Sequence, residues 1–162
     1  MFKKILLPLD GSALAERAID PVEMIASGTG AEVLLLRIVT APLGTAPEAG
    51  QVEESQAFQE GAGKAKAYLD KVAARLAAKS VKSRILITSG EPYAGILRIA
   101  HKEDVDFIAM TTHGGTALER ALLGSTAEKV VYTTKRPVFL VKPEKIHAAR
   151  AIDEGDIFIK AR

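Results

Sequence analysis

The feature of this chain that most constrains its fold is a short apolar run joined by a loop to a predicted helix. Residues 107–110 read Phe-Ile-Ala-Met, which is typical of a strand buried on both faces of a parallel sheet. Beyond the loop, Ser125 is followed three residues later by Glu128, the spacing of a capping box, which predicts a helix with Ser125 as its N-cap. A strand, a loop and a helix in this order form the repeating unit of parallel α/β sheets.

The loop itself, residues 111–124, has features of an anion-binding loop. Gly114, Gly115 and Gly124 carry no Cβ, so the backbone there can adopt positive φ and approach a ligand closely. The exposed N–H groups at the start of the following helix attract anions. This stretch therefore predicts a phosphate-binding site at the end of a buried strand.

The rest of the chain alternates apolar runs with helical patterns. Strands are predicted at residues 5–7, at 33–39, which is apolar apart from Arg37, at 84–88, at 104–112 and at 137–141. Helices are predicted over about 13–26, with a kink at Pro21, from Phe58 to Leu76, from Pro92, and over about 127–134. Five strands alternating with four helices predict an α/β fold, a doubly wound open parallel sheet with helices on both faces.

Asp10 directly follows the first predicted strand, and Ser12 is the predicted N-cap of the next helix. If the first strand is central, the topological switch lies between strands one and four, and Asp10 and Gly114 face the same crevice. The Asp10 carboxylate could accept hydrogen bonds from ribose hydroxyls there, or it could help to cap the first helix. The spacing alone favours neither role.

Composition and charge exclude several classes of protein. The 162 residues include no cysteine, which excludes disulfides and thiolate metal sites and agrees with a reducing compartment. The net charge of +2 comes from mixed acidic and basic residues, so no nucleic-acid partner is expected. No apolar run approaches the roughly 20 residues of a membrane span and no export signal is seen. We therefore expect a soluble, cytoplasmic protein with no membrane partner.

The sequence predicts a binding protein rather than an enzyme. It contains no Walker A lysine loop, no Gly-x-Gly-x-x-Gly after the first strand and no paired carboxylates. The histidines lie at no metal-ligand spacing from carboxylates, so neither a catalytic residue nor a dedicated metal site is predicted. Slow ATP hydrolysis stays open, although no general base can be named.

A family resemblance rests on the same loop. Thr111-Thr112-His113-Gly114, nine residues, and then Gly124-Ser125 resemble the nucleotide loop of universal stress proteins, written Gly-x-x-Gly, nine residues, Gly-Ser/Thr. Thr111 stands where the family pattern has its first glycine. Softer matches occur at residues 4–10, 90–92 and 136–141, and the resemblance covers about residues 2–143. It implies a Rossmann-like fold of the adenine nucleotide alpha hydrolase type with strand order 3-2-1-4-5, and a domain over 1–143 followed by a tail over 144–162.

The resemblance also implies a ligand and its site. The ligand would be ATP, or else AMP or ADP, with Mg²⁺ arriving together with the nucleotide. Asp10 would contact the nucleotide, and Pro8, Ile38 and Met110 would lie near the adenine, although their plainer role is core packing. The other candidate binding residues come from the loop and the helix after it, namely Thr111, His113, Gly114, Gly124, Ser125 and Thr126.

Two functions remain open on this reading. The first is a nucleotide-binding regulatory protein of the universal stress response with little or no turnover. The second is a member that has lost nucleotide binding and acts through protein contacts, which the branched side chain of Thr111 favours. Because only one of the three pattern glycines is replaced, the sequence favours binding.

Self-association is predicted for the last strand. Residues 137–141 form a nearly continuous apolar edge strand, and proteins usually cover such edges. The resemblance points to a homodimer through this strand. The apolar residues 157–159 of the tail are predicted to dock on the folded dimer, with the partner subunit as the candidate surface.

Overall fold

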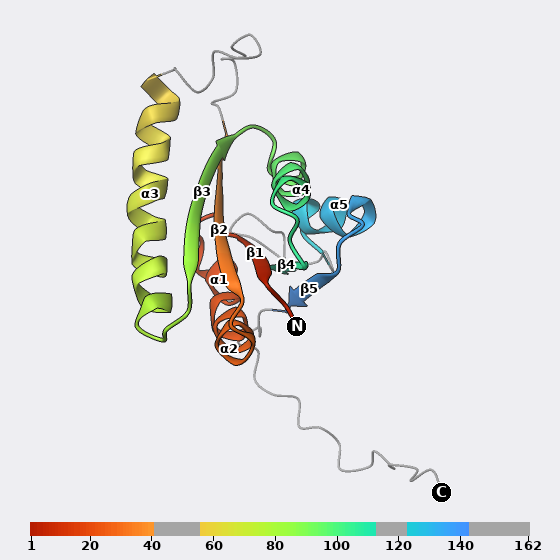
Figure 1. Cartoon of the computed structure of the whole chain (residues 1–162). Coiled ribbons are helices and arrows are strands. Elements are labelled where there is room, and N and C mark those ends of the chain that lie inside the picture. Colours follow the sequence, from red (N-terminus) through yellow and green to blue (C-terminus); the bar gives the residue numbers. More distant parts are fainter. Residues whose placement is uncertain (41–55, 113–122, 143–162) are drawn as a thin grey trace, which may run out of the picture.

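The structure, a computed structural model, describes residues 1–40, 56–112 and 123–142. Within these ranges the chain forms one sheet of five parallel strands with helices packed around it (Figure 1). The strands are β1 (Lys4–Pro8), β2 (Glu32–Val39), β3 (Ser83–Ser89), β4 (Phe107–Thr111) and β5 (Val138–Val141). Their order is β3-β2-β1-β4-β5, which confirms the predicted topology. Several segments lie outside the described residues, namely the candidate residues His113 and Gly114, Gly115, most of the loop after β2, and the C-terminal tail.

β1 is the central strand of the sheet. Leu6 is paired with Leu34 of β2 on one side and with Ile108 of β4 on the other. Ile5, Leu6 and Leu7 are all fully buried, although neighbouring side chains of a strand point to opposite faces. Both faces are therefore covered, which explains the uninterrupted apolar run in place of an alternating pattern.

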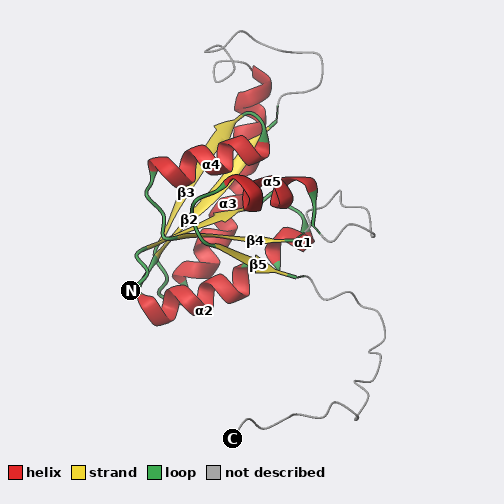
Figure 2. Cartoon of the chain, turned by 90° about the vertical axis from the view of Figure 1, so that its right-hand side faces the viewer, coloured by secondary structure: helices red, strands yellow, loops and turns green. Residues whose placement is uncertain are grey.

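The helices form one layer on each face of the sheet (Figures 1 and 2). One hydrophobic cluster joins Ile5 and Leu7 to side chains of α1 (Ala13–Glu16), α2 (Ile19–Thr29) and α3 (Gln56–Ala77). A second cluster joins Leu6 to α4 (Pro92–Lys102) and α5 (Ser125–Thr133) on the opposite face. The doubly wound architecture is therefore confirmed.

The first helical segment differs from its prediction. Instead of one helix kinked at Pro21, the chain forms α1 and α2, and the break falls at Arg17 and Ala18. Ala18 is the N-cap of α2, so Pro21 lies in the first turn, where backbone N–H groups have no intrahelical acceptor. The proline therefore removes no helical hydrogen bond, and the predicted kink is wrong. Gly30 ends α2 in the left-handed conformation with φ of 74°.

Two helices approach the carboxyl end of β2 closely because each presents a glycine there. A Cβ built on Gly61 of α3 would lie 2.7 Å from Cγ1 of Val39, and one on Gly95 of α4 would lie 2.8 Å from Cδ1 of Ile38. Successive residues of β2 thus press against helices on opposite faces. This packing fixes the end of β2, from which the candidate site is partly built.

α3 carries the predicted apolar stripe, with Ala65, Leu69, Val72 and Leu76 buried. At 22 residues it is a long helix, but its remaining positions are rich in polar and charged side chains. Across the described ranges, no helix combines the length and the apolar character needed to cross a membrane.

Candidate functional site

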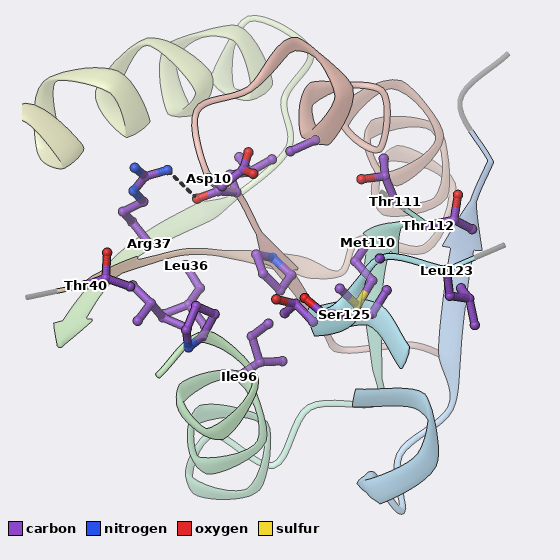
Figure 3. Close-up of a pocket in the computed structure, with 18 residues that line it drawn as sticks. Asp10, Leu36, Arg37, Thr40, Ile96, Met110, Thr111, Thr112, Leu123 and Ser125 are labelled. Carbon is purple, nitrogen blue, oxygen red and sulfur yellow. Dashed lines mark hydrogen bonds between the residues drawn. The ribbon is translucent and has the colours of Figure 1, made fainter. Parts of the chain in front are cut away.

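A pocket of about 620 Å³ opens at the carboxyl ends of β1, β2 and β4 (Figure 3). This is the edge where the chain winds outward in two directions, and open α/β sheets bind ligands at that position. Apolar side chains from three strands and from α4 form one part of its wall, and polar side chains stand around it. The apolar residues include Pro8, Leu36, Ile38, Ile96 and Met110, and the polar ones include Asp10, Arg37, Thr40, Thr111, Thr112 and Ser125.

Asp10 lies in the turn that connects β1 to α1. Its Oδ1 accepts the backbone N–H of Ser12 at 2.9 Å, while the Ser12 hydroxyl oxygen accepts the N–H of Ala15 at 3.1 Å. The predicted N-cap at Ser12 is therefore confirmed. The helix is capped by Ser12, and Asp10 shapes the turn before it and lines the pocket.

The start of α5 differs from its prediction by one residue. The N-cap is Gly124, and Ser125 is the first helical residue, with no side-chain hydrogen bond at the cap. The backbone N–H of Glu128 donates to the carbonyl of Gly124 at 2.9 Å, so the predicted capping box around Ser125 is wrong. Gly124 has φ of −68°, a value that any residue can adopt, so the positive φ that a glycine permits is not used at this residue.

The N–H of Gly124 already has an acceptor. It donates to the carbonyl oxygen of Thr112 at 2.6 Å, which joins the end of β4 to the start of α5. The donors that α5 can offer an anion are therefore those of its first turn, at Ser125, Thr126 and Ala127, because the N–H groups there have no intrahelical acceptor. All three of these residues line the pocket.

The apolar candidates serve the core and the pocket together. Ile38 and Met110 pack in the hydrophobic cluster beneath α4 and α5, and Met110 is 7% exposed. Both residues also line the pocket, as does Pro8 at the end of β1. The two roles considered for these residues are therefore compatible.

Thr111 and Thr112 are among the few buried polar residues of the described chain. They are 6% and 9% exposed, and both line the pocket. Thr111 is paired with Val141 in the sheet, and the N–H of Thr112 donates to the carbonyl of Val141 at 3.0 Å. The side chain that replaces the pattern glycine is thus accommodated in the wall of the pocket.

The structure brings together the sequence candidates that it describes. All of these line the one pocket, namely Pro8, Asp10, Ile38, Met110, Thr111, Gly124, Ser125 and Thr126. In the sequence they are spread over the ends of three strands and the start of one helix, so their convergence follows from the sheet order.

Arg37 also lines the pocket and was not among the predicted site residues. Its Nη1 donates to the carbonyl of Leu9 at 3.3 Å across the pocket rim (Figure 3). Tyr68 of α3 is a neighbour of the same turn. Burial raises the pKa of Tyr68 well above its usual range, and the carboxylates of Glu16 and Asp10 raise it further. One signal was present in the sequence, because Arg37 alone interrupts an apolar strand.

No metal centre is evident in the described part of the chain. Its His, Asp and Glu residues form no group of three or more that could hold a metal ion.

Sequence comparison gives this site a family context. A sequence profile of the Universal stress protein family matches residues 1–142. Universal stress protein MJ0577 of Methanocaldococcus jannaschii is 33% identical over 155 residues, covering 88% of this chain and 96% of that protein. Universal stress protein MJ0531 of the same organism is 35% identical over 147 residues, covering 90% and 85%.

Solved structures agree with this relationship. The structure of MJ0577 superposes with a TM-score of 0.76 at 31% identity, covering 90% of this chain and 99% of that one. The structure of universal stress protein UspA from Lactobacillus plantarum has the same TM-score at 24% identity, covering 86% and 97%, and it supports the fold alone. The profile match and the identity to MJ0577 together establish that this chain belongs to the universal stress protein family.

Proposed function

We propose that this protein binds an adenine nucleotide, ATP or else AMP or ADP, and acts as a regulatory protein with little or no turnover. The observation that carries the proposal is that one pocket combines a carboxylate, an apolar slot and the first turn of a helix. Its volume of about 620 Å³ suits a ligand of nucleotide size, since pockets for small molecules span roughly 300–1,000 Å³.

Each part of a nucleotide has a chemically suitable partner in this pocket. The adenine ring is flat and largely apolar, which fits the slot lined by Pro8, Ile38 and Met110. Asp10 can accept hydrogen bonds from ribose hydroxyls. The first turn of α5 at Ser125 offers N–H donors and the positive end of a helix dipole to phosphates. Mg²⁺ would be carried in by the phosphates of ATP, which supply the oxygen ligands it prefers.

The described lining gives little support to catalysis. In that part of the wall, Asp10 is the only carboxylate and no histidine is present. A hydrolase would need a base near the phosphates to activate water. We therefore infer a role in binding, and the lack of cysteine in the chain agrees with action in the reducing cytoplasm.

Other members of the fold give context for the ligand. One solved universal stress protein is described as a complex with cAMP, and another, from Archaeoglobus fulgidus, as a complex with dAMP. They share 19% and 18% identity with this chain, so the likeness is one of fold. Proteins of this architecture can therefore hold an adenine nucleotide.

We further propose that the protein forms a homodimer through β5. Phe139 of β5 is 40% exposed, and Phe2 before β1 is 47% exposed. Both rings pack edge-on against Phe107, with centroids 6.5 Å and 5.0 Å away. Pairing two copies along β5 would remove the exposed ring of Phe139 from water and satisfy the edge of the sheet.

Thr111 favours a second candidate function, in which the protein acts only through protein contacts. The buried side chain occupies part of the pocket wall where the family pattern has glycine. One experiment separates the two functions. Purified protein is denatured and the supernatant analysed for nucleotide, and the nucleotide-free protein is then titrated with ATP and Mg²⁺ in a calorimeter. Saturable heat supports the nucleotide role, whereas absence of both signals supports the protein-contact role.

A further inference from the structure

We propose that Arg37 is a positioning residue, which holds the turn around Asp10 in the conformation that presents its carboxylate to a ribose. The effect on ligand binding rests on the proposed nucleotide function. Its structural part, the bracing of the turn, can be measured without any ligand.

The guanidinium of Arg37 hydrogen-bonds the backbone before Asp10 and lies close to the residue after it. Its Nη1 donates to the carbonyl of Leu9, the preceding residue, at 3.3 Å. A Cβ built on Gly11, the following residue, would lie 3.4 Å from the same nitrogen. Arg37 belongs to β2, so the contact fastens the turn after β1 to the neighbouring strand.

The conformation of this turn decides where the Asp10 carboxylate points. Gly11 has φ of +83°, which lies in the left-handed region that side chains disfavour. Asp10 accepts the N–H of Ser12 through Oδ1, so the carboxylate is oriented by the turn it belongs to. A shift of the backbone at Leu9 or Gly11 would therefore turn this carboxylate away.

The guanidinium is committed to the backbone and not to a carboxylate. Within the described residues, its hydrogen bond is the one to Leu9, and it takes part in no ion pair. It nevertheless lies in an acidic setting. Burial raises the pKa of Tyr68, the carboxylates of Glu16 and Asp10 raise it further, and the charge of Arg37 opposes them. Arg37 thus offsets negative charge around Asp10 without neutralising it in a direct pair.

The location of Arg37 favours positioning over contact with the phosphates. In Figure 3 its guanidinium stands on the Asp10 side of the pocket, well apart from Ser125 at the start of α5. A phosphate bound at the first turn of α5 would lie at the end of the pocket away from Arg37. The effect of Arg37 should therefore concern the ribose and not the phosphate tail.

The structural part is tested on the ligand-free protein by amide NMR. Arg37→Gln should shift the amide signals of Gly11 and Ser12 and raise the exchange rate of the Ser12 amide roughly tenfold, because a local opening is no longer restrained. The matched control is Arg98→Gln, since Arg98 donates to the hydroxyl oxygen of Thr88 at 2.7 Å and does not line the pocket. Unchanged Gly11 and Ser12 signals in Arg37→Gln overturn the proposal.

The binding part uses ATP and 3′-deoxy-ATP as paired ligands. Wild type should prefer ATP, Arg37→Gln should lose most of that preference, and Kd for 3′-deoxy-ATP should change less than about twofold. Arg37→Lys should recover part of the preference, because its ammonium can still donate to the Leu9 carbonyl. Adding Arg37→Gln to Asp10→Asn should weaken ATP binding no further than Asp10→Asn alone.

The outcomes separate this inference from the function it rests on. If Arg37→Gln weakens both ligands equally, Arg37 contacts the base or the phosphates directly and the positioning role is wrong. If wild type binds neither ligand, the nucleotide function fails, and the amide signals still decide whether Arg37 braces the turn.

Discussion

The backbone N–H of Gly124 donates to the carbonyl oxygen of Thr112 at 2.6 Å, and this hydrogen bond holds the two ends of the candidate phosphate loop together. Thr112 follows β4 and Gly124 caps α5, so the bond fixes where the helix begins relative to the sheet. Any phosphate at the first turn of α5 would lie directly beside this junction.

A side chain at residue 124 should weaken nucleotide binding while leaving the fold intact. The φ and ψ of Gly124, −68° and 153°, suit any residue, so Gly124→Val should fold. Its side chain would stand at the first turn of α5, and we expect ATP affinity to fall at least roughly tenfold, about 1.4 kcal/mol. Gly28→Val is the control, because a Cβ there meets no atom within 4 Å and the residue lies outside the pocket. Equal ATP affinity of Gly124→Val and wild type in calorimetry would contradict the proposed phosphate position.

Removing the Asp10 carboxylate should reduce affinity more than stability. Asp10→Ala loses a ribose acceptor, which corresponds to about 1.5–3 kcal/mol of binding free energy. Ser12→Ala is the matched control, since it removes the N-cap bond to Ala15 and should lower the unfolding free energy by about 1 kcal/mol. Calorimetry should show the larger loss of ATP affinity for Asp10→Ala. Thermal unfolding should show the larger loss of stability for Ser12→Ala. Equal loss of affinity in the two would mean that the turn, and not the carboxylate, matters.

Thr111→Gly should show whether the Thr111 side chain narrows the pocket or only stabilises the fold. Thr111 is 6% exposed inside a strand, so glycine there should destabilise the protein by about 1 kcal/mol or more. If Thr111 narrows the pocket, the same change should tighten ATP binding, and Thr111→Ser should have a smaller effect in the same direction. Weaker binding in both variants would show that the threonine supports the site.

Stability at acid pH should depend on Asp106, which directly precedes β4 at the end of the sheet opposite the pocket. Its carboxylate accepts the backbone N–H groups of Lys4 at 2.8 Å and Lys3 at 2.6 Å, and these bonds lower its pKa from the ordinary 3.8. A lowered folded-state pKa means that the stabilisation is present above the unfolded-state value and is lost as pH falls through the folded-state value. Denaturant unfolding of Asp106→Asn should therefore show a shallower loss of stability below about pH 4 than wild type does. Parallel curves would contradict this assignment.

A charge on β5 should disrupt the proposed dimer. Phe139→Asp places two carboxylates in an isologous contact, which should give a monomer in sedimentation at micromolar concentration. Met24→Asp is the control, because Met24 is 76% exposed and belongs to α2 and not to β5. A wild type that already sediments as a monomer would contradict the proposal.

The architecture could be predicted well from the sequence because burial leaves a recognisable residue pattern within a single strand or helix. The continuous apolar run in β1 reflects burial on both faces, and the apolar stripe of α3 reflects packing on one. The convergence of Asp10 with Ser125 was predictable once the sheet order was inferred. The strand order itself depended on the family resemblance.

The predictions that are wrong or absent concern features set by contacts between residues far apart in the sequence. Ser125 and Glu128 matched a capping pattern, but the bond between Gly124 and Thr112 makes Gly124 the cap. The kink predicted at Pro21 is wrong because the actual break, at Arg17 and Ala18, has no marker in the sequence. Arg37 stood out as the one charge in an apolar strand, yet only the fold shows that it reaches the Leu9 carbonyl.

The glycine at residue 95 determines how closely α4 packs on a strand that lines the pocket. Gly95 lets α4 press on Ile38, while Pro92 and Ile96 of the same helix line the pocket. A methyl group at residue 95 would lie 2.8 Å from Cδ1 of Ile38, so the Ile38 side chain, which lines the pocket, would have to move. The shape of the apolar slot can therefore be altered from a position outside the pocket lining, and a search for variants with a reshaped pocket should include residue 95.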